Sequence, residues 1–155
     1  QLERSQQYHA RFLKIYPNAV WGNFRLAVLK TLQQEEPEAI RLYQQVLSLQ
    51  PDHAASLNNL AWTFLTSGDP KLRNNSEALS MAQKAVRLQA SVDHLDTLAE
   101  AYFQSGQPIE AIQTIRRAIL ITPLDSDRYP YLLKQFNRFR QGDTDSAPPS
   151  LSSAS

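Results

Sequence analysis

Residues 95–123 read LDTLAEAYFQSGQPIEAIQTIRRAILITP, and this stretch decides the fold. Its first half places apolar residues at i, i+3, i+4 and i+7, so that they share one helical face: Leu95, Leu98, Ala99 and Tyr102. Gly106 can end this helix in a left-handed C-cap conformation, and Pro108 suits the first turn of a second helix. The stretch therefore predicts two amphipathic helices joined by a tight turn.

Small residues indicate which kind of helical hairpin this is. Ala99 and Ala111 stand where the two helices would cross, and alanine lets the two backbones approach closely. With Val92 as position one, the pattern resembles the tetratricopeptide repeat (TPR), a helix–turn–helix unit of about 34 residues. The residues at signature positions are Leu95, Leu98, Ala99, Tyr102, Gly106, Ala111, Ala118 and Pro123, whereas Leu95 and Ile115 replace the usual tryptophan and second-helix aromatic.

The same spacing recurs along the chain, and the resemblance implies an all-α TPR solenoid. We expect a half-repeat helix in residues 1–17, with Tyr8, Phe12, Leu13 and Ile15 on its buried side; an independent N-terminal helix is the alternative. Three full repeats should follow in residues 20–53, 54–90 and 92–123. A capping helix is expected in residues 126–140, and the Ser- and Pro-rich residues 142–155 should be disordered.

The second repeat carries an insert at its turn. Ala39 and Ala78 hold equivalent positions, yet they are 39 residues apart, about five more than the repeat period. The extra residues fall in 67–75, and we expect Leu72 to pack back onto the repeat and Asn75 or Ser76 to cap the next helix. A D-P-x-L-R insert is similar to that of terminal TPR segments in bacterial proteins, some of them membrane-associated.

Composition narrows the classes of function. The 155 residues carry a formal net charge of +1 and no cysteine, so neither a disulfide framework nor a thiolate metal site is expected. No apolar run is long enough to cross a bilayer. Because the chain opens on Gln1 in what reads as mid-helix, we expect a piece of a larger bacterial protein, from the cytoplasm or the periplasm.

Motifs for catalysis are missing from the sequence. The four glycines form no phosphate-binding loop, and the three histidines stand far apart and read as structural or solvent-exposed: His9, His53 and His94. Asp93, Asp96 and Glu100 share one helical face, which we interpret as a solvated acidic face rather than a cation site. We therefore expect no catalytic residue, metal ion or cofactor, and a protein that is not an enzyme.

The TPR resemblance implies a concave groove lined by the first helix of each repeat. Family groove positions, together with two residues of the capping helix, give the candidate ligand-binding residues: Trp21, Phe24, Val28, Asn58, Asn59, Trp62, Leu65, Asp93, Asp96, Glu100, Phe103, Lys134 and Arg138. One end of this groove is apolar and aromatic, and the other is acidic. For the two tryptophans, packing against the N-terminal helix or under the inserted loop is the alternative.

One activity known in the family can be tested on these positions. Chaperone-binding TPR domains hold a C-terminal carboxylate with Lys, Asn and Arg, but the matching positions here are Phe24, Val28, Asn59, Asp93 and Thr97. Only the asparagine agrees, and Asp93 would repel a carboxylate. We expect no such clamp, no nucleic-acid binding because the groove is acidic, and a protein or peptide partner that is basic or apolar.

The sequence therefore predicts a non-catalytic protein–protein interaction scaffold that binds a peptide or helical segment in its groove. Two alternatives stay open. The half-repeat could pair with another copy and give a homo-oligomer. The chain could also be an accessory domain of a larger bacterial multi-domain protein or enzyme, because a fold does not determine a function.

Overall fold

The computed structural model describes residues 4, 7–8, 11, 15 and 19–142. Residues 19–142 form helices without any strand: α2 (Val20–Leu32), α3 (Glu36–Leu49), α4 (Ala54–Thr66), the 3₁₀ helix η1 (Pro70–Leu72), α5 (Asn75–Leu88), α6 (Val92–Gln104), α7 (Pro108–Ile121) and α8 (Arg128–Gln141). The predicted all-α class is confirmed.

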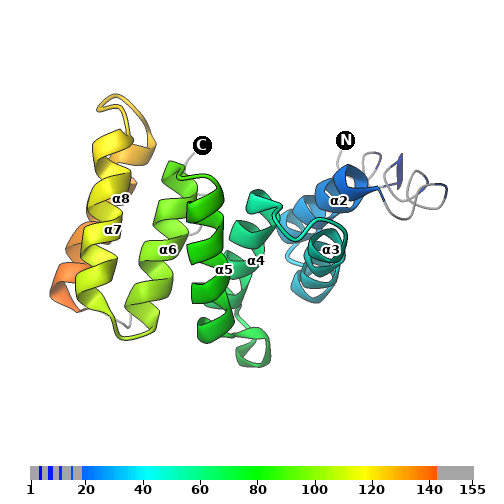
Figure 1. Cartoon of the computed structure of the whole chain (residues 1–155), viewed down its shortest axis with the longest axis horizontal. Coiled ribbons are helices and arrows are strands. Elements are labelled where there is room, and N and C mark those ends of the chain that lie inside the picture. The colour runs from blue at the N-terminus through cyan, green and yellow to red at the C-terminus, as the bar shows by residue number, and fades with distance from the viewer. Residues whose placement is uncertain (1–3, 5–6, 9–10, 12–14, 16–18, 143–155) are drawn as a thin grey trace.

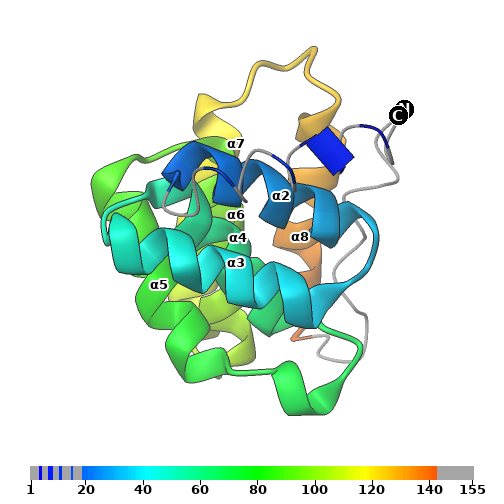
Figure 2. The same cartoon turned by 90° about the vertical axis from the view of Figure 1, so that its right-hand side faces the viewer.

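Consecutive helices form three hairpins, α2–α3, α4–α5 and α6–α7, which stack in chain order along the long axis of the molecule (Figure 1). Helix α3 packs on α4, and both α4 and α5 pack on α6. Helix α8 follows the third hairpin and packs on α7. Figure 2 looks along the stack with α2 and α3 in front, and it shows the helices layered one behind another. This is the solenoid arrangement of a TPR protein.

The α6–α7 hairpin has the features that its sequence indicated. Ala99 and Ala111 are fully buried between the two helices. Gly106 has a positive φ of 73°, a conformation that a side chain would strain, and Pro108 stands in the first turn of α7. The backbone N–H of Gln107 donates to the carbonyl of Tyr102 at 2.9 Å, which closes the turn.

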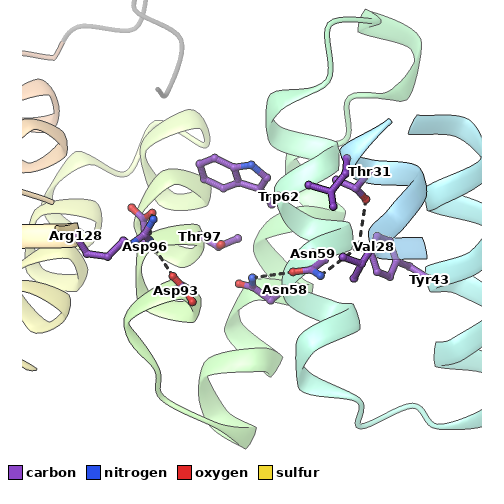
Figure 3. A pocket seen from close by; sticks show the side chains of 11 residues that line it. Val28, Thr31, Tyr43, Asn58, Asn59, Trp62, Asp93, Asp96, Thr97 and Arg128 are labelled. Atoms are coloured by element: carbon purple, nitrogen blue, oxygen red, sulfur yellow. Dashed lines mark hydrogen bonds and ion pairs between the residues drawn. The ribbon is translucent and has the colours of Figure 1, made fainter. Parts of the chain in front are cut away.

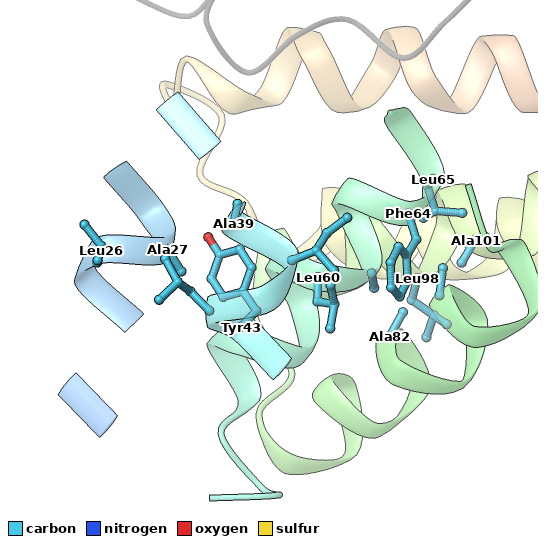
Figure 4. Close-up of a cluster of buried hydrophobic side chains, with 14 residues drawn as sticks. Leu26, Ala27, Ala39, Tyr43, Leu60, Phe64, Leu65, Ala82, Leu98 and Ala101 are labelled. Carbon is cyan, nitrogen blue, oxygen red and sulfur yellow. The ribbon is translucent and has the colours of Figure 1, made fainter. Parts of the chain in front are cut away.

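Two apolar clusters hold the stack together. The first joins α2 to α6 around the buried side chains of Tyr43, Leu60 and Phe64 (Figure 4). The second joins α6, α7 and α8, where Leu132 and Phe139 of α8 are almost completely buried. Because the second cluster extends onto α8, this helix covers the apolar face that the third hairpin would otherwise expose to water.

The insert of the second hairpin folds back as expected. Leu72 is partly buried against the first apolar cluster. The guanidinium Nε of Arg73 donates to the carbonyl of Ser67 at 2.8 Å, and the Ser67 hydroxyl donates to Glu36 at 2.5 Å. The second of these contacts attaches the insert to α3 of the first hairpin.

The N-cap of α5 differs from the prediction. Asn74 caps the helix, since its side-chain oxygen accepts from the backbone N–H of Glu77 at 3.2 Å. Asn75 is instead the first helical residue, and its side chain donates to the carbonyl of Gln104 at 3.3 Å. The expectation of a cap at Asn75 or Ser76 was wrong because the helix begins one residue earlier, and a cap must precede the first helical residue.

Several predictions concern residues 1–18 and 143–155. Phe12 and Leu13 lie outside the described residues, as does the tail from residue 143 onward. Tyr8 and Ile15 are described and are about 70% exposed, so their expected burial is wrong. Within the described part of the chain, no helix combines the length and hydrophobicity needed to cross a membrane.

Candidate functional site

A pocket opens in the groove between α2, α4, α6 and the start of α8 (Figure 3). Its volume is about 270 Å³, and its lining residues come from all three hairpins: Val28, Thr31, Leu32, Tyr43, Asn58, Asn59, Trp62, Asp93, Asp96, Thr97 and Arg128. Clefts that hold drug-sized ligands measure about 300–1,000 Å³. The pocket therefore lies just below this range, and a volume of this size can hold one or two side chains of a partner.

One wall of the pocket is apolar. Its apolar lining comes from Val28 and Leu32 of α2 and from Trp62 of α4, whose indole points toward α6 (Figure 3). Leu32 is 67% exposed, and the other two side chains are half-buried. Since the core does not enclose these side chains, their apolar surface is available to a partner.

The floor of the pocket carries a series of linked hydrogen bonds, in which each side chain donates to the next in the same direction. The Thr31 hydroxyl donates to the carbonyl of Ala27 at 3.1 Å, so the Tyr43 hydroxyl 3.2 Å away must donate to Thr31. Tyr43 in turn accepts from the amide Nδ2 of Asn59 at 3.2 Å. Burial raises the pKa of the Tyr43 phenol, so the proton needed for this arrangement stays in place.

Asn58 stands at the head of this chain. Its Nδ2 donates to Oδ1 of Asn59 over 3.4 Å, and its side chain is only 8% exposed. Its own Oδ1 is buried and accepts no hydrogen bond. An acceptor that is buried without a donor is costly, about 1–3 kcal/mol, unless a ligand or water supplies one.

The opposite wall carries charge. Arg128 of α8 donates through Nη2 to Oδ1 of Asp93 at 2.9 Å and to Oδ2 of Asp96 at 3.3 Å. Asp93 is exposed, whereas the carboxyl of Asp96 is buried beside Arg128 and within hydrogen-bond reach of the Tyr131 hydroxyl. Burial raises the pKa of Asp96 to about 7, although the nearby Arg128 opposes this shift.

The predicted solvated acidic face is not solvated. Only Asp93 is exposed, because α8 covers the other two carboxylates and supplies an arginine to each of them. Arg138 donates to Glu100, whose second oxygen accepts from Gln104 at 2.8 Å. Burial raises the pKa of Glu100, and the Arg138 charge opposes that shift. The acidic end of the groove is thus largely neutralised by α8.

The thirteen candidate residues divide into three groups. Six of them line the pocket: Val28, Asn58, Asn59, Trp62, Asp93 and Asp96. Four are buried instead of lining an open groove: Leu65, Glu100, Phe103 and Arg138. Leu65 and Phe103 belong to the apolar clusters, and Glu100 pairs with Arg138, so packing between units removes all four from the surface.

The last three candidates lie outside the pocket. Trp21 is 60% exposed and stacks with the guanidinium of Arg25, 5.6 Å from its ring. Phe24 is half-buried against His53, with 4.8 Å between ring centroids. Lys134 is exposed on α8.

Tyr43 and Arg128 are pocket residues that sequence patterns did not indicate. Tyr43 occupies a core position of the second helix, and its ring is fully buried while its hydroxyl reaches the pocket floor. Arg128 begins α8, which follows the last repeat. Spacing offered no signal, because Arg128 and Arg138 are 10 residues apart, whereas Asp96 and Glu100, which they bind, are 4 residues apart.

The two described histidines have structural roles, as predicted. Nδ1 of His53 accepts from the backbone N–H of Ser56 at 3.2 Å and caps α4. His94 is buried, with Nδ1 2.6 Å from the carbonyl of Gln89. His9 lies outside the described residues.

Known proteins resemble the chain in sequence and in fold. Residues 42–80 and residues 95–123 match two family models, each described as a tetratricopeptide repeat. A structure of MamA is 18% identical, covers 89% of this chain and 86% of its own, and has a TM-score of 0.67. MamA 41-end from Desulfovibrio magneticus RS-1 is 16% identical over 94% of this chain and 88% of its own, with a TM-score of 0.68.

YrrB, described as a TPR protein with an unusual peptide-binding site, is 17% identical. It covers 87% of this chain and 74% of its own, with a TM-score of 0.66. At such identities the likeness shows a shared fold. No curated protein sequence matches the chain at a significant level.

Proposed function

This chain is a tetratricopeptide-repeat protein, and from that premise we propose that it is a protein–protein interaction scaffold that binds a peptide or helical segment in its concave groove. Repeats of this family are interaction modules whose stacked first helices form an extended binding surface. The role needs no catalytic residue, metal ion or cofactor from this chain. That the protein is not an enzyme remains a prediction.

The pocket is the observation that carries the proposal. It joins apolar surface at the exposed Leu32 and the half-buried Trp62 to the buried Oδ1 of Asn58, which lacks a hydrogen-bond partner. Burying apolar surface against a partner stabilises a complex. A buried acceptor without a hydrogen bond favours a partner that supplies a hydrogen-bond donor. YrrB, which shares the fold, is described as having a peptide-binding site, and this supports the same kind of ligand here.

The charges of the groove favour a basic or apolar partner. Asp93 keeps an exposed carboxylate beside the pocket, with one oxygen bound by Arg128 and the other open to a partner. A carboxylate-terminated peptide would meet this charge and the acceptor oxygen of Asn58, so the chaperone type of ligand is disfavoured. Nucleic-acid phosphates are disfavoured for the same reason.

Selection from a random peptide library displayed on phage tests the proposal. Peptides enriched on the wild-type chain should lose at least tenfold in affinity on Trp62→Ala, which removes a pocket wall. Leu120→Ala is the matched control, because Leu120 is 81% exposed on α7 and outside the pocket. Failure to enrich any peptide, or enriched peptides that bind Trp62→Ala as tightly as wild type, would contradict groove binding.

Self-association is a second candidate, favoured by the exposed side chains of Trp21 and Leu32 on α2. The mass measured by light scattering across a range of concentrations distinguishes self-association from binding of a different partner. A mass that doubles with concentration and falls back in Trp21→Ala supports pairing of copies through α2. A monomer at every concentration leaves the groove free for another partner.

A further inference from the structure

We infer that the pocket holds the phenol of a tyrosine side chain, with its ring against Trp62 of α4 and its hydroxyl donating to Oδ1 of Asn58. This inference rests on the proposed function, because the tyrosine would belong to the bound peptide. Three features carry it: an unsatisfied acceptor at the base of the pocket, the indole one helical turn away on the same helix, and the difference in depth between the two.

The base of the pocket presents one acceptor. Nδ2 of Asn58 donates to Asn59, whose own Nδ2 donates to the Tyr43 hydroxyl. These bonds fix the orientation of the Asn58 amide and leave its Oδ1 buried without a hydrogen bond. Figure 3 draws this oxygen on the side of α6, away from Asn59. A ligand that supplies one donor here satisfies the atom, and linked hydrogen bonds strengthen it as an acceptor.

Trp62 stands one helical turn from this acceptor. Residues four apart on a helix are neighbours on one face, with about 5–6 Å between their Cβ atoms. Asn58 and Trp62 both line the pocket, and Figure 3 shows both side chains directed toward α6. Asn58 is buried, whereas Trp62 is half-buried. The indole therefore flanks the entrance, and the acceptor lies deeper beside it.

A phenol matches this arrangement. Its ring is flat and apolar, and its hydroxyl projects from the tip of the side chain. A ring that lies beside the Trp62 indole brings its hydroxyl to the level of Asn58, one turn along α4. Pairs of aromatic rings stabilise each other in offset or edge-to-face arrangements. The buried Thr97 lines the same pocket from α6 and adds no charge to the site.

Other side chains satisfy fewer of these groups. Phenylalanine and aliphatic side chains leave Oδ1 of Asn58 without a donor. A lysine ammonium has three donors, but Asn58 offers one oxygen, and the Asp96 carboxyl lies among groups of α8. An indole carries its N–H on the side of its rings, whereas a phenol carries its donor at the tip.

The charge beside the pocket makes the site specific for an unmodified tyrosine. Phosphorylation removes the phenolic proton and adds a charge of about −1.5 to −2. The exposed carboxylate of Asp93 lines the pocket and would repel that charge. A phosphotyrosine would thus lose the donor for Asn58 and meet a like charge.

The test is an NMR titration of the ¹⁵N-labelled chain with N-acetyl-tyrosine N-methylamide. Two comparison compounds share its ring and backbone: the phenylalanine compound lacks the hydroxyl, and the O-methyl-tyrosine compound keeps the oxygen without its proton. We expect the tyrosine compound to bind about tenfold more tightly than either and to shift the side-chain amide signals of Asn58. The phosphotyrosine compound should not bind detectably.

Two variants separate the ring from the hydroxyl. Trp62→Ala should weaken the tyrosine and phenylalanine compounds by the same factor, because both lose the indole. Asn58→Leu should weaken only the tyrosine compound and abolish its advantage. Asn137→Leu, the same substitution at an exposed position of α8, should change neither. If Asn58→Leu fails to fold, the three compounds compared on the wild-type chain decide.

Two outcomes overturn the inference. If the phenylalanine or O-methyl-tyrosine compound binds as tightly as the tyrosine compound, the Asn58 oxygen gains nothing from the hydroxyl. If the corresponding tryptophan compound binds more tightly, the pocket holds an indole instead of a phenol.

Failure of this inference can be told apart from failure of the proposed function. Library peptides that depend on Trp62 but contain no tyrosine would leave groove binding intact and overturn the tyrosine site. A tyrosine compound that binds at Asn58, with no peptide enriched from the library, would support the site and contradict the proposed function.

Discussion

Arg138 of α8 donates a hydrogen bond to Glu100 of α6, and both side chains are buried. The pair is enclosed by further polar groups, because Gln135 accepts from Nε of Arg138 at 2.9 Å and Gln104 donates to Glu100 at 2.8 Å. Isolated buried charges are unfavourable, but here each charge has its partners. The register of α8 against α6 is therefore set by polar contacts as well as by the apolar cluster.

Removing Arg138 alone should be strongly destabilising. Arg138→Met leaves Glu100 buried without its counter-charge, and we expect a loss of about 3–5 kcal/mol in the free energy of unfolding by urea denaturation. The double variant Arg138→Met/Glu100→Leu should recover most of this loss. Arg140→Met, at an exposed position of the same helix, is the control. A double variant as unstable as the single one would contradict the role assigned to the pair.

Stability should depend on pH through Asp96. Its pKa is raised from 3.8 to about 7 in the folded chain, so the folded state binds this proton more tightly than the unfolded state does. Stabilisation from this group is fully present below pH 4 and is lost as pH rises to about 7, with a limiting slope of about 1.4 kcal/mol per pH unit.

Urea denaturation at several pH values checks this prediction. Asp96→Asn should remove the falling component between pH 4 and 7, so the difference between the two curves isolates the group. Asp52→Asn should leave the curve unchanged, since Asp52 is exposed. Parallel curves for wild type and Asp96→Asn would show that burial does not raise the pKa of this carboxyl.

The pocket floor should depend on the Tyr43 hydroxyl. Tyr43→Phe removes the acceptor for Asn59 and the donor for Thr31. We expect a loss of about 0.5–1.5 kcal/mol in the free energy of unfolding, together with NMR shifts of the Asn59 side-chain amide. Tyr129→Phe, on α8 outside the pocket, should change neither quantity. An unperturbed Asn59 amide in Tyr43→Phe would rule out the chain of hydrogen bonds.

The helix crossing of the third hairpin should reject larger side chains. Ala99 and Ala111 are fully buried where α6 meets α7, so added methylenes would have to displace packed neighbours. Ala99→Leu should cost at least about 1–3 kcal/mol, and thermal unfolding measures the change. Ala90→Leu, at an exposed position between α5 and α6, is the control with the same substitution. Equal melting temperatures would contradict close packing at the crossing.

Local spacing was enough to predict the repeats. The small residues Ala99 and Ala111 indicate that two helices cross closely. Gly106 and Pro108 indicate the turn, because each residue restricts the backbone only at its own position and next to it. These signals need no knowledge of the remaining chain. The insert was predicted for the same reason, since a change in the spacing of Ala39 and Ala78 is visible in the sequence alone.

The candidate site was predicted less completely, because burial depends on what packs against a helix. Asp96 and Glu100 share one face of α6, and only the arrival of α8 decides whether water or arginine meets them. Tyr43 reaches the pocket from a helix that family patterns assign to the core. Contacts between units thus decide which groove positions stay open, and a single-helix pattern cannot reveal them.

The hydrogen bonds between units also bear on the mechanics of the stack. A solenoid bends at the joints between its units, and each joint is as stiff as the contacts that cross it. On the groove side, the neutral contact of Asn59 with Tyr43 crosses the first joint, whereas buried ion pairs such as Arg138 with Glu100 cross the last. Under load, the curvature should therefore change more readily between α2 and α4 than between α6 and α8.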